Sequence, residues 1–173
     1  MAAVAAVLSS CGSKGFRTDE LGVKVSAEEN REYSYTDKKA GYWYGRTHVE
    51  VADWYSGWNM AKKRILADYT LSIDGNVLDR SMAECTVYPD RLVRKWDNAV
   101  ETFRMIDNLP VIHIAVESDS DATSIALDRS LITDSYEAGD MAFFIPDEAP
   151  DKRIMLAGDG AKGFVLTYGT EEE

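Results

Sequence analysis

The feature that most constrains the fold of this chain is a regular alternation of apolar and polar residues along short segments. Between Arg64 and Ile73 every second residue is apolar: Ile65, Ala67, Tyr69, Leu71 and Ile73. Leu66 is the only apolar residue on the other side of this segment. A period of two is the pattern of a β-strand that buries one face. Residues 64–73 are therefore predicted to form a half-buried strand.

Turn residues follow this strand and predict its continuation. Asp74-Gly75-Asn76 is typical of a tight turn, since glycine tolerates a positive φ and Asp or Asn bonds its own backbone. A second strand, Val77–Tyr88, is expected to return antiparallel. Pro89-Asp90 then predicts another turn, with a strand over Arg91–Trp96 after it.

Further short apolar segments extend the pattern to the end of the chain. Residues 111–116 are apolar on both faces except for His113, which predicts a central strand covered on both sides. The remaining predicted strands are Thr123–Leu127, Met141–Ile145, Arg153–Leu156 and Phe164–Tyr168. About nine short strands separated by turn residues predict an all-β fold, an antiparallel β-sandwich. Residues 54–65 and 96–106 keep helical spacing, so one short helix is allowed in either place.

Length and charge narrow the class of protein. A chain of 173 residues with 45% hydrophobic residues can bury a core as one domain, predicted over residues 19–173. The net charge of −11 repels phosphate backbones, so nucleic acid is not an expected partner. Two cysteines and two histidines predict neither a disulfide scaffold nor a metal centre. No cofactor is expected, because Gly158–Gly163 fits a dinucleotide pattern but precedes a strand-like segment, as a hairpin turn does.

The first 18 residues differ in kind from the rest. Residues 2–8 are apolar and uncharged, and Leu8-Ser9-Ser10-Cys11 resembles a bacterial lipobox, in which the cysteine is acylated. Residues 1–18 are therefore interpreted as a lipoprotein signal remnant and a flexible tether, with Cys11 as the lipidation site. The alternative is an alanine-rich end with an incidental cysteine, since no basic residue precedes Lys14. The second cysteine, Cys85, is predicted to be a small buried hydrophobe.

The titratable residues give little support to catalysis. His48 alternates with valines and is predicted to face outward, while His113 is predicted to be a hydrogen-bonded core histidine. Neither has a metal-ligand neighbour in sequence, and no nucleophile motif is present. The acidic segment 117–123 lacks the glycine and final glutamate of a calcium loop, which favours a solvated loop.

The aromatic residues are unevenly distributed. Residues 42–58 hold three of the four tryptophans. Flat aromatic faces suit the apolar faces of sugar rings, and neighbouring polar groups can hold hydroxyls. The predicted glycan-binding candidates are Tyr42, Trp43, Trp54, Trp58, Arg46 and Glu50. The alternative is that these rings belong to the core, because alternation sends Trp43 opposite to Tyr42 and Tyr44.

The lipobox, the acidic sandwich pattern and the turn Val87-Tyr88-Pro89-Asp90-Arg91-Leu92 together suggest a family. The chain resembles, over about residues 19–170, the N-terminal β-sandwich that precedes an α/α barrel in cell-envelope glycoside hydrolases of Gram-negative bacteria. In those enzymes the carboxylates that cut the glycosidic bond lie mainly in the barrel. The resemblance implies a severed domain or a stand-alone relative that does not hydrolyse glycans unaided, and it assigns no catalytic residue.

These observations lead to two expected functions. The first is a non-catalytic, lipid-anchored envelope domain associated with carbohydrate processing, which contacts a glycan or docks onto a glycoside hydrolase barrel. The second is a structural or protein-interaction envelope lipoprotein without sugar specificity. In both, the membrane is reached only through Cys11, at the periplasmic face or the cell surface of the outer membrane.

Overall fold

The computed structural model describes residues 17–49, 53–120 and 122–158. In this part of the chain the protein forms fifteen β-strands and two short 3₁₀-helices, Thr18–Leu21 (η1) and Arg80–Met82 (η2). All strand pairs are antiparallel and the arrangement is sandwich-like. The prediction of an all-β fold is therefore confirmed, with fifteen strands in place of about nine.

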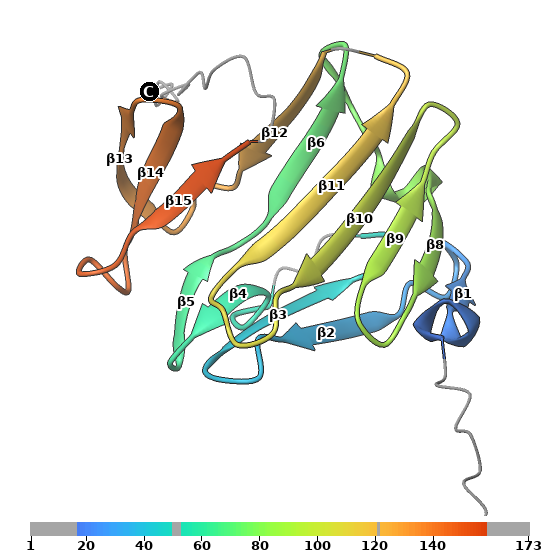
Figure 1. Ribbon diagram of the computed structural model, residues 1–173, viewed down its shortest axis with the longest axis horizontal. Coiled ribbons are helices and arrows are strands. Elements are labelled where there is room, and N and C mark those ends of the chain that lie inside the picture. The colour runs from blue at the N-terminus through green and yellow to red at the C-terminus, as the bar shows by residue number, and fades with distance from the viewer. Residues whose placement is uncertain (1–16, 50–52, 121, 159–173) are drawn as a thin grey trace, which may run out of the picture.

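The strands form four sheets (Figure 1). The largest has the order β1 (Val23–Val25), β8 (Glu84–Val87), β9 (Leu92–Lys95), β10 (Ala99–Met105) and β11 (Ile112–Ser118). A second sheet contains β2 (Glu32–Thr36), β3 (Gly41–Arg46), β4 (Gly57–Met60) and β5 (Lys63–Leu66). Two three-stranded sheets have the orders β12 (Thr123–Leu127), β6 (Tyr69–Ile73), β7 (Asn76–Val77) and β13 (Ile132–Ala138), β14 (Met141–Pro146), β15 (Ile154–Ala157).

The core lies between the two largest sheets. In Figure 1, β2 and β3 run across the direction of β8 to β11. Phe103 of β10 is fully buried and packs against Tyr33 and Tyr35 of β2 and Trp43 of β3, with ring centroids 6.4, 6.3 and 5.1 Å from its own. Aromatic rings at these separations contribute packing energy beyond their buried area. This aromatic cluster joins the two layers.

The segment predicted as one strand, residues 64–73, is two strands that meet at a corner. β5 pairs with β4, and β6 pairs with β12 in a different sheet. Asp68 lies at the change of direction, where the Arg80 guanidinium binds its carboxylate with both terminal nitrogens, at 2.7 and 3.0 Å. The backbone oxygen of Asp68 accepts from Asp128 N–H. The alternation correctly predicts a strand in each half of the segment. It does not show that the two halves belong to different sheets.

The turns between strands are largely as predicted. Ile73 pairs with Asn76, so Asp74 and Gly75 form a two-residue hairpin loop, both with positive φ (51° and 77°). The Tyr88 amide donates to the Arg91 carbonyl at 2.8 Å, which closes the predicted turn at Pro89-Asp90. The predicted strand over residues 77–88 is wrong in part, because η2 separates β7 from β8.

The short helix allowed at residues 54–65 or 96–106 is wrong. These segments form β4 with β5, and β10. In β10 the buried positions alternate, and one of them is Glu101. A carboxylate on the buried face hides the period of two, which explains the misleading helical spacing. No helix among the described residues is long and apolar enough to cross a membrane.

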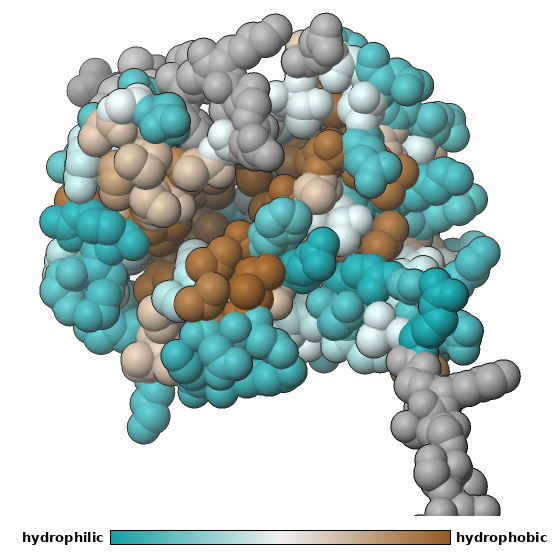
Figure 2. Space-filling model, in the orientation of Figure 1, coloured by the Kyte–Doolittle hydropathy of each residue, from teal (hydrophilic) through white to brown (hydrophobic). Residues whose placement is uncertain are grey.

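Strand β11 was predicted to be central, but it lies at the edge of its sheet. Its apolar residues are only half-buried, and His113 is exposed. The prediction of a core histidine at 113 is therefore wrong. On the face shown in Figure 2, hydrophobic side chains gather beside the sheet of β13 to β15, and hydrophilic side chains surround them.

Candidate functional site

Strand β3 separates the aromatic residues of the predicted glycan site into two sets. Trp43 points into the core and is 3% exposed, and its cross-strand partner Trp58 is 8% exposed. Tyr42 and Tyr44, on either side of Trp43, lie on the opposite face of the strand, where Tyr42 is exposed and Tyr44 is half-buried. Trp43 and Trp58 therefore cannot stack on a sugar in this structure, because they are already packed inside the sandwich. The alternative interpretation, that these two rings are core, holds for them.

Trp54 is presented to solvent by a tightly held turn. Its side chain is 83% exposed. The Ser56 amide donates to the Asp53 carbonyl at 3.1 Å, and this bond closes the turn around Trp54. Arg64 donates to the Ser56 hydroxyl at 2.9 Å, and the Asn59 amide donates to the Tyr55 carbonyl at 2.8 Å. The turn is thus fixed from two neighbouring strands.

The rings outside the core are grouped here as the aromatic strip: Tyr42, Tyr44, Trp54 and Tyr55. The centroids of Tyr44 and Tyr55 are 4.8 Å apart. Those of Trp54 and Tyr55 are 5.2 Å apart with the planes at 83°, an edge-to-face contact. Gly57 is the cross-strand partner of Tyr44, so no side chain competes for the space beside that ring. These contacts join Trp54 to Tyr55 and, through it, to Tyr44, and neither of these two rings is among the predicted site residues.

Polar groups lie at one end of the aromatic strip. Arg46 follows Tyr44 on the same face of β3, and its guanidinium is 3.3 Å from the carboxylate of Glu32 on β2. Both side chains are partly exposed. Burial, together with Tyr55 and Glu32, raises the pKa of the Tyr44 hydroxyl, which stays protonated at neutral pH. Two other predicted residues, Glu50 and Cys11, lie outside the described residues.

Sequence reasoning did not assign Tyr44, Tyr55 or Glu32 to the site. Alternation around Trp43 already placed Tyr44 on the same face as Tyr42, so that signal was present. Glu32 reaches Arg46 only through the pairing of β2 with β3. That cross-strand register has no local signature in the sequence.

A second group of polar residues lies inside the sandwich. Arg94 of β9 and Glu101 of β10 are each 1% exposed, with Nη1 and Oε2 2.9 Å apart. Arg94 also donates to the backbone oxygens of Thr47 at 2.8 Å and Arg46 at 3.1 Å. The Tyr69 hydroxyl donates to the other carboxylate oxygen of Glu101. These bonds connect β3, β6, β9 and β10.

Electrostatics in this network follow from burial and charge pairing. Burial alone would lower the pKa of Arg94. The neighbouring Glu101, Tyr33 and Tyr69 raise the pKa by more than burial lowers it, so the pKa of Arg94 lies above its ordinary value. Burial and the neighbouring Glu101 carboxylate raise the pKa of Tyr69. The network therefore consists of an ion pair and a neutral phenol.

His48 was predicted to face outward, and this is wrong. The residue is 2% exposed, with Nε2 donating to the Ala83 carbonyl at 3.2 Å and Nδ1 accepting from the Thr47 hydroxyl at 2.9 Å. Strand β3 ends at Arg46, so alternation no longer places the side chain of His48. Burial lowers the pKa of the imidazole, and a neutral His48 fits both bonds.

The cysteine of the described residues and their acidic and histidine side chains give no reactive or metal-binding site. Cys85 is buried in β8 as predicted, and burial raises the pKa of its thiol to about 11. Such a thiol is protonated at neutral pH and shielded from reagents. Among the described residues, no three His, Cys, Asp or Glu side chains are grouped to hold a metal ion. The acidic segment 117–123 and the glycine-rich segment 158–163 are only partly described, at residues 117–120, 122–123 and 158.

Comparison of the chain with protein-family models, with curated proteins and with solved structures found no match.

Proposed function

We propose that this protein is a non-catalytic domain that contacts carbohydrate through the aromatic strip. The single observation that carries the proposal is the exposure of Trp54, a large apolar ring held in solvent by a fixed turn. Exposing an indole forgoes the free energy of burying it, about 2–3 kcal/mol for a large apolar side chain. Because hydrogen bonds already fix the turn that carries Trp54, its backbone loses little conformational entropy on binding, which favours a recognition role.

The geometry of the strip suits a sugar chain better than a compact ligand. Tyr42 and Tyr44 are two residues apart on one face of β3, so their side chains are about 7 Å apart. Tyr55 and Trp54 continue the apolar surface beyond Tyr44. Arg46 and Glu32 can then exchange hydrogen bonds with hydroxyls beside the rings.

The charge of the chain restricts the class of glycan. A net charge of −11 repels polyanions at moderate ionic strength. Neutral polysaccharides are therefore the proposed ligands, and acidic ones such as polygalacturonate are not. An anchor at Cys11 in the bacterial envelope, and docking onto a glycoside hydrolase barrel, remain part of the proposal on sequence grounds alone.

Electrophoresis in native gels that contain single polysaccharides tests the proposal. Xyloglucan, laminarin, starch, galactomannan and xylan serve as neutral probes, and polygalacturonate as an acidic one. We expect at least one neutral probe to retard the wild-type protein and Trp54→Ala to abolish the retardation. Met82→Ala is the matched control, because Met82 is another highly exposed apolar side chain away from the aromatic strip.

Retardation that persists in Trp54→Ala would show that the strip is not the binding surface. If no polysaccharide retards the wild type while a stoichiometric protein partner co-purifies, the protein-interaction function replaces the carbohydrate function. In both cases the thermal transition of each variant is measured, so that loss of binding is not confused with loss of fold.

A further inference from the structure

The sheet of β13, β14 and β15 carries apolar side chains on both of its faces. One face is buried in the core, with Ala142, Phe144 and Ile154. An antiparallel sheet that covers a core usually has a polar, solvated second face. The second face of this sheet, which we call the outer face, instead carries mainly apolar side chains that are exposed or half-buried. A contiguous apolar patch of this kind is typical of an interaction site.

The pairing register arranges the outer face in three rows that cross the sheet. The rows are Asp134 with Ile145, Tyr136 with Phe143 and Met155, and Ala138 with Met141 and Ala157. Arg153, one residue before β15, continues this register beside Ile145. Seven of these nine positions are apolar or aromatic. The two charged residues, Asp134 and Arg153, lie at opposite ends of the first row.

The middle row forms an ordered apolar ridge. The rings of Tyr136 and Phe143 are stacked, with centroids 5.1 Å apart and planes 10° apart. Tyr136 is 43% exposed, and Met155 at the end of the row is 56% exposed. Stacked rings beside an adaptable thioether can pack against a second surface of the same kind.

The two charged side chains of the first row have hydrogen-bonding capacity to spare. Among the described residues, Asp134 accepts only from the Ser135 amide, at 2.7 Å. In the same part of the chain, Arg153 donates through one terminal nitrogen to the backbone oxygens of Pro150 and Lys152, at 2.9 and 2.6 Å. The second carboxylate oxygen and the other guanidinium nitrogens can therefore meet an opposite charge from a partner.

We propose that two copies of this chain associate through their outer faces, about a two-fold axis that runs along β14. Rotation about this axis places β13 of one copy over β15 of the other. Asp134 then faces the partner subunit's Arg153, and symmetry repeats this pair. Tyr136 faces the partner subunit's Met155, and Phe143 faces its own copy. The strands of the two sheets stay aligned, as in sheets that pack face to face in sandwiches.

The size of the outer face sets the strength of this dimer. Rows lie about 7 Å apart along the strands, and strands lie about 4.8 Å apart, so the nine positions span roughly 10 Å by 14 Å between α-carbons. A stable interface buries about 800 Å² on each partner, which is considerably more. We therefore expect a weak dimer, with a Kd of about 0.1–1 mM.

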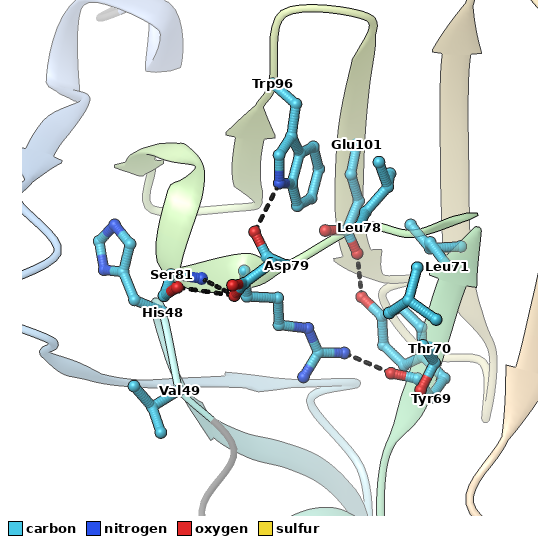
Figure 3. Close-up of a pocket in the computed structure, with 12 residues that line it drawn as sticks. His48, Val49, Tyr69, Thr70, Leu71, Leu78, Asp79, Ser81, Trp96 and Glu101 are labelled. Carbon is cyan, nitrogen blue, oxygen red and sulfur yellow. Dashed lines mark hydrogen bonds between the residues drawn. The ribbon is translucent and has the colours of Figure 1, made fainter. Parts of the chain in front are cut away.

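The proposed interface is separate from the aromatic strip and from the cavity of about 370 Å³ beside the buried polar network (Figure 3). The described residues that line the cavity come from elements other than β13, β14 and β15. At the cavity, the Trp96 indole N–H donates to the Asp79 carbonyl at 2.7 Å, and the Tyr69 hydroxyl donates to Glu101. Association through the outer face leaves these bonds unchanged. The inference is therefore independent of carbohydrate binding.

Sedimentation equilibrium at about 150 mM salt measures the association, because the repulsion between two acidic copies is then screened beyond about 8 Å. We expect the average mass of the wild type to rise toward twice that of the monomer between about 10 μM and about 1 mM. Met155→Glu places a charge in the middle row and is expected to weaken association by about tenfold or more. Met82→Glu is the matched control, because Met82 is 75% exposed and lies on η2, away from the outer face.

Exchange of the two charges tests the orientation of the dimer. Asp134→Arg and Arg153→Asp each bring like charges together twice, so each is expected to weaken association by about tenfold. The double variant, Asp134→Arg with Arg153→Asp, should return to within about threefold of the wild type. The thermal transition of every variant is measured, so that a change of association is not confused with a loss of fold.

A double variant that associates as weakly as the single variants would overturn the two-fold arrangement. Single variants that associate as tightly as the wild type would overturn it as well. A wild type that stays monomeric at every concentration would overturn the dimer. Equal association by Met155→Glu and Met82→Glu would overturn the outer face as its interface.

Discussion

At the scale of single residues, the most consequential contact is the buried ion pair of Arg94 and Glu101. Removing one partner leaves the other charge buried and unpaired, which costs about 3–5 kcal/mol, while replacing both with apolar residues costs much less. We therefore expect Arg94→Met to lower the free energy of unfolding by about 3–5 kcal/mol, and Arg94→Met with Glu101→Leu to recover a substantial part of it. Urea unfolding at neutral pH measures all variants. If the double variant lost the sum of the two single-variant losses in unfolding free energy, the ion pair would not be the stabilising contact described here.

His48 gives stability a dependence on pH. Its pKa is lowered in the folded protein, so the unfolded chain binds the proton more readily once the pH falls below the ordinary value of about 6.5. The contribution of His48 is complete above that pH and is lost as the pH falls through its folded-state pKa. We expect stability to fall by up to about 1.4 kcal/mol per pH unit in this window.

Replacing His48 with glutamine tests this pH dependence. His48→Gln should flatten the slope between neutral pH and about pH 5, where only histidine side chains titrate with ordinary pKa values. Denaturant midpoints at several pH values decide the matter. An unchanged slope in His48→Gln would be inconsistent with a buried, neutral imidazole.

At the scale of elements, the corner between β5 and β6 depends on Gly57. Its φ is 90°, and a Cβ there would lie 2.1 Å from the Leu66 carbonyl oxygen and 2.2 Å from that of Ala67. Gly75 also has a positive φ, 77°, but a Cβ there meets nothing within 4 Å. We expect Gly75→Ala to cost about 1–2 kcal/mol from backbone strain alone. Gly57→Ala should cost about 3 kcal/mol or more, because strain and a backbone clash add.

Thermal or urea unfolding of the two glycine variants separates the causes. They share the unfavourable backbone conformation and differ only in the space around the new methyl group. Similar destabilisation in the two would mean that β4 does not pass beneath the corner as the structure shows.

The same elements show which parts of the fold are readable in sequence. Thr123–Leu127 was predicted with its observed bounds, and the Asp74-Gly75 turn was predicted because turn chemistry is local. β10 was missed because Glu101 occupies a core position, and the pairing partner of that carboxylate lies on another strand. A buried charge interrupts the hydrophobic period, and only the tertiary structure supplies its counter-charge.

At the scale of the whole molecule, the layers of the sandwich decide which aromatic residues of segment 42–58 are buried and which are exposed. The sequence showed only that these residues are close together in the chain. The sequence showed the concentration of aromatic residues between positions 42 and 58, and alternation placed Tyr42 and Trp43 on opposite faces. The burial of Trp58 and the exposure of Trp54 depend on the turn that Arg64 and Asn59 hold, so sequence could not distinguish them. The network of Arg94 and Glu101 had no signal in the sequence, because its members come from four separate strands, β3, β6, β9 and β10.

This sorting predicts opposite outcomes for two tryptophans. Trp58→Ala removes a core ring and should destabilise the protein by about 3–5 kcal/mol. Trp54→Ala should change the free energy of unfolding by no more than about 0.5 kcal/mol, as expected at an exposed position. Urea unfolding measures both. A large loss of stability in Trp54→Ala would mean that the ring serves the fold rather than a ligand.

The central claim is that Trp54 meets a neutral glycan while the inner tryptophans do not. The most direct test is titration of the protein, labelled with ¹⁵N in its tryptophan indoles, with neutral hexasaccharides of glucose, mannose and xylose. The account predicts a saturable shift of the Trp54 indole signal with at least one of them. The signals of Trp43 and Trp58 should move little, because these rings are buried. A Trp54 signal unmoved by every hexasaccharide would contradict the proposed function.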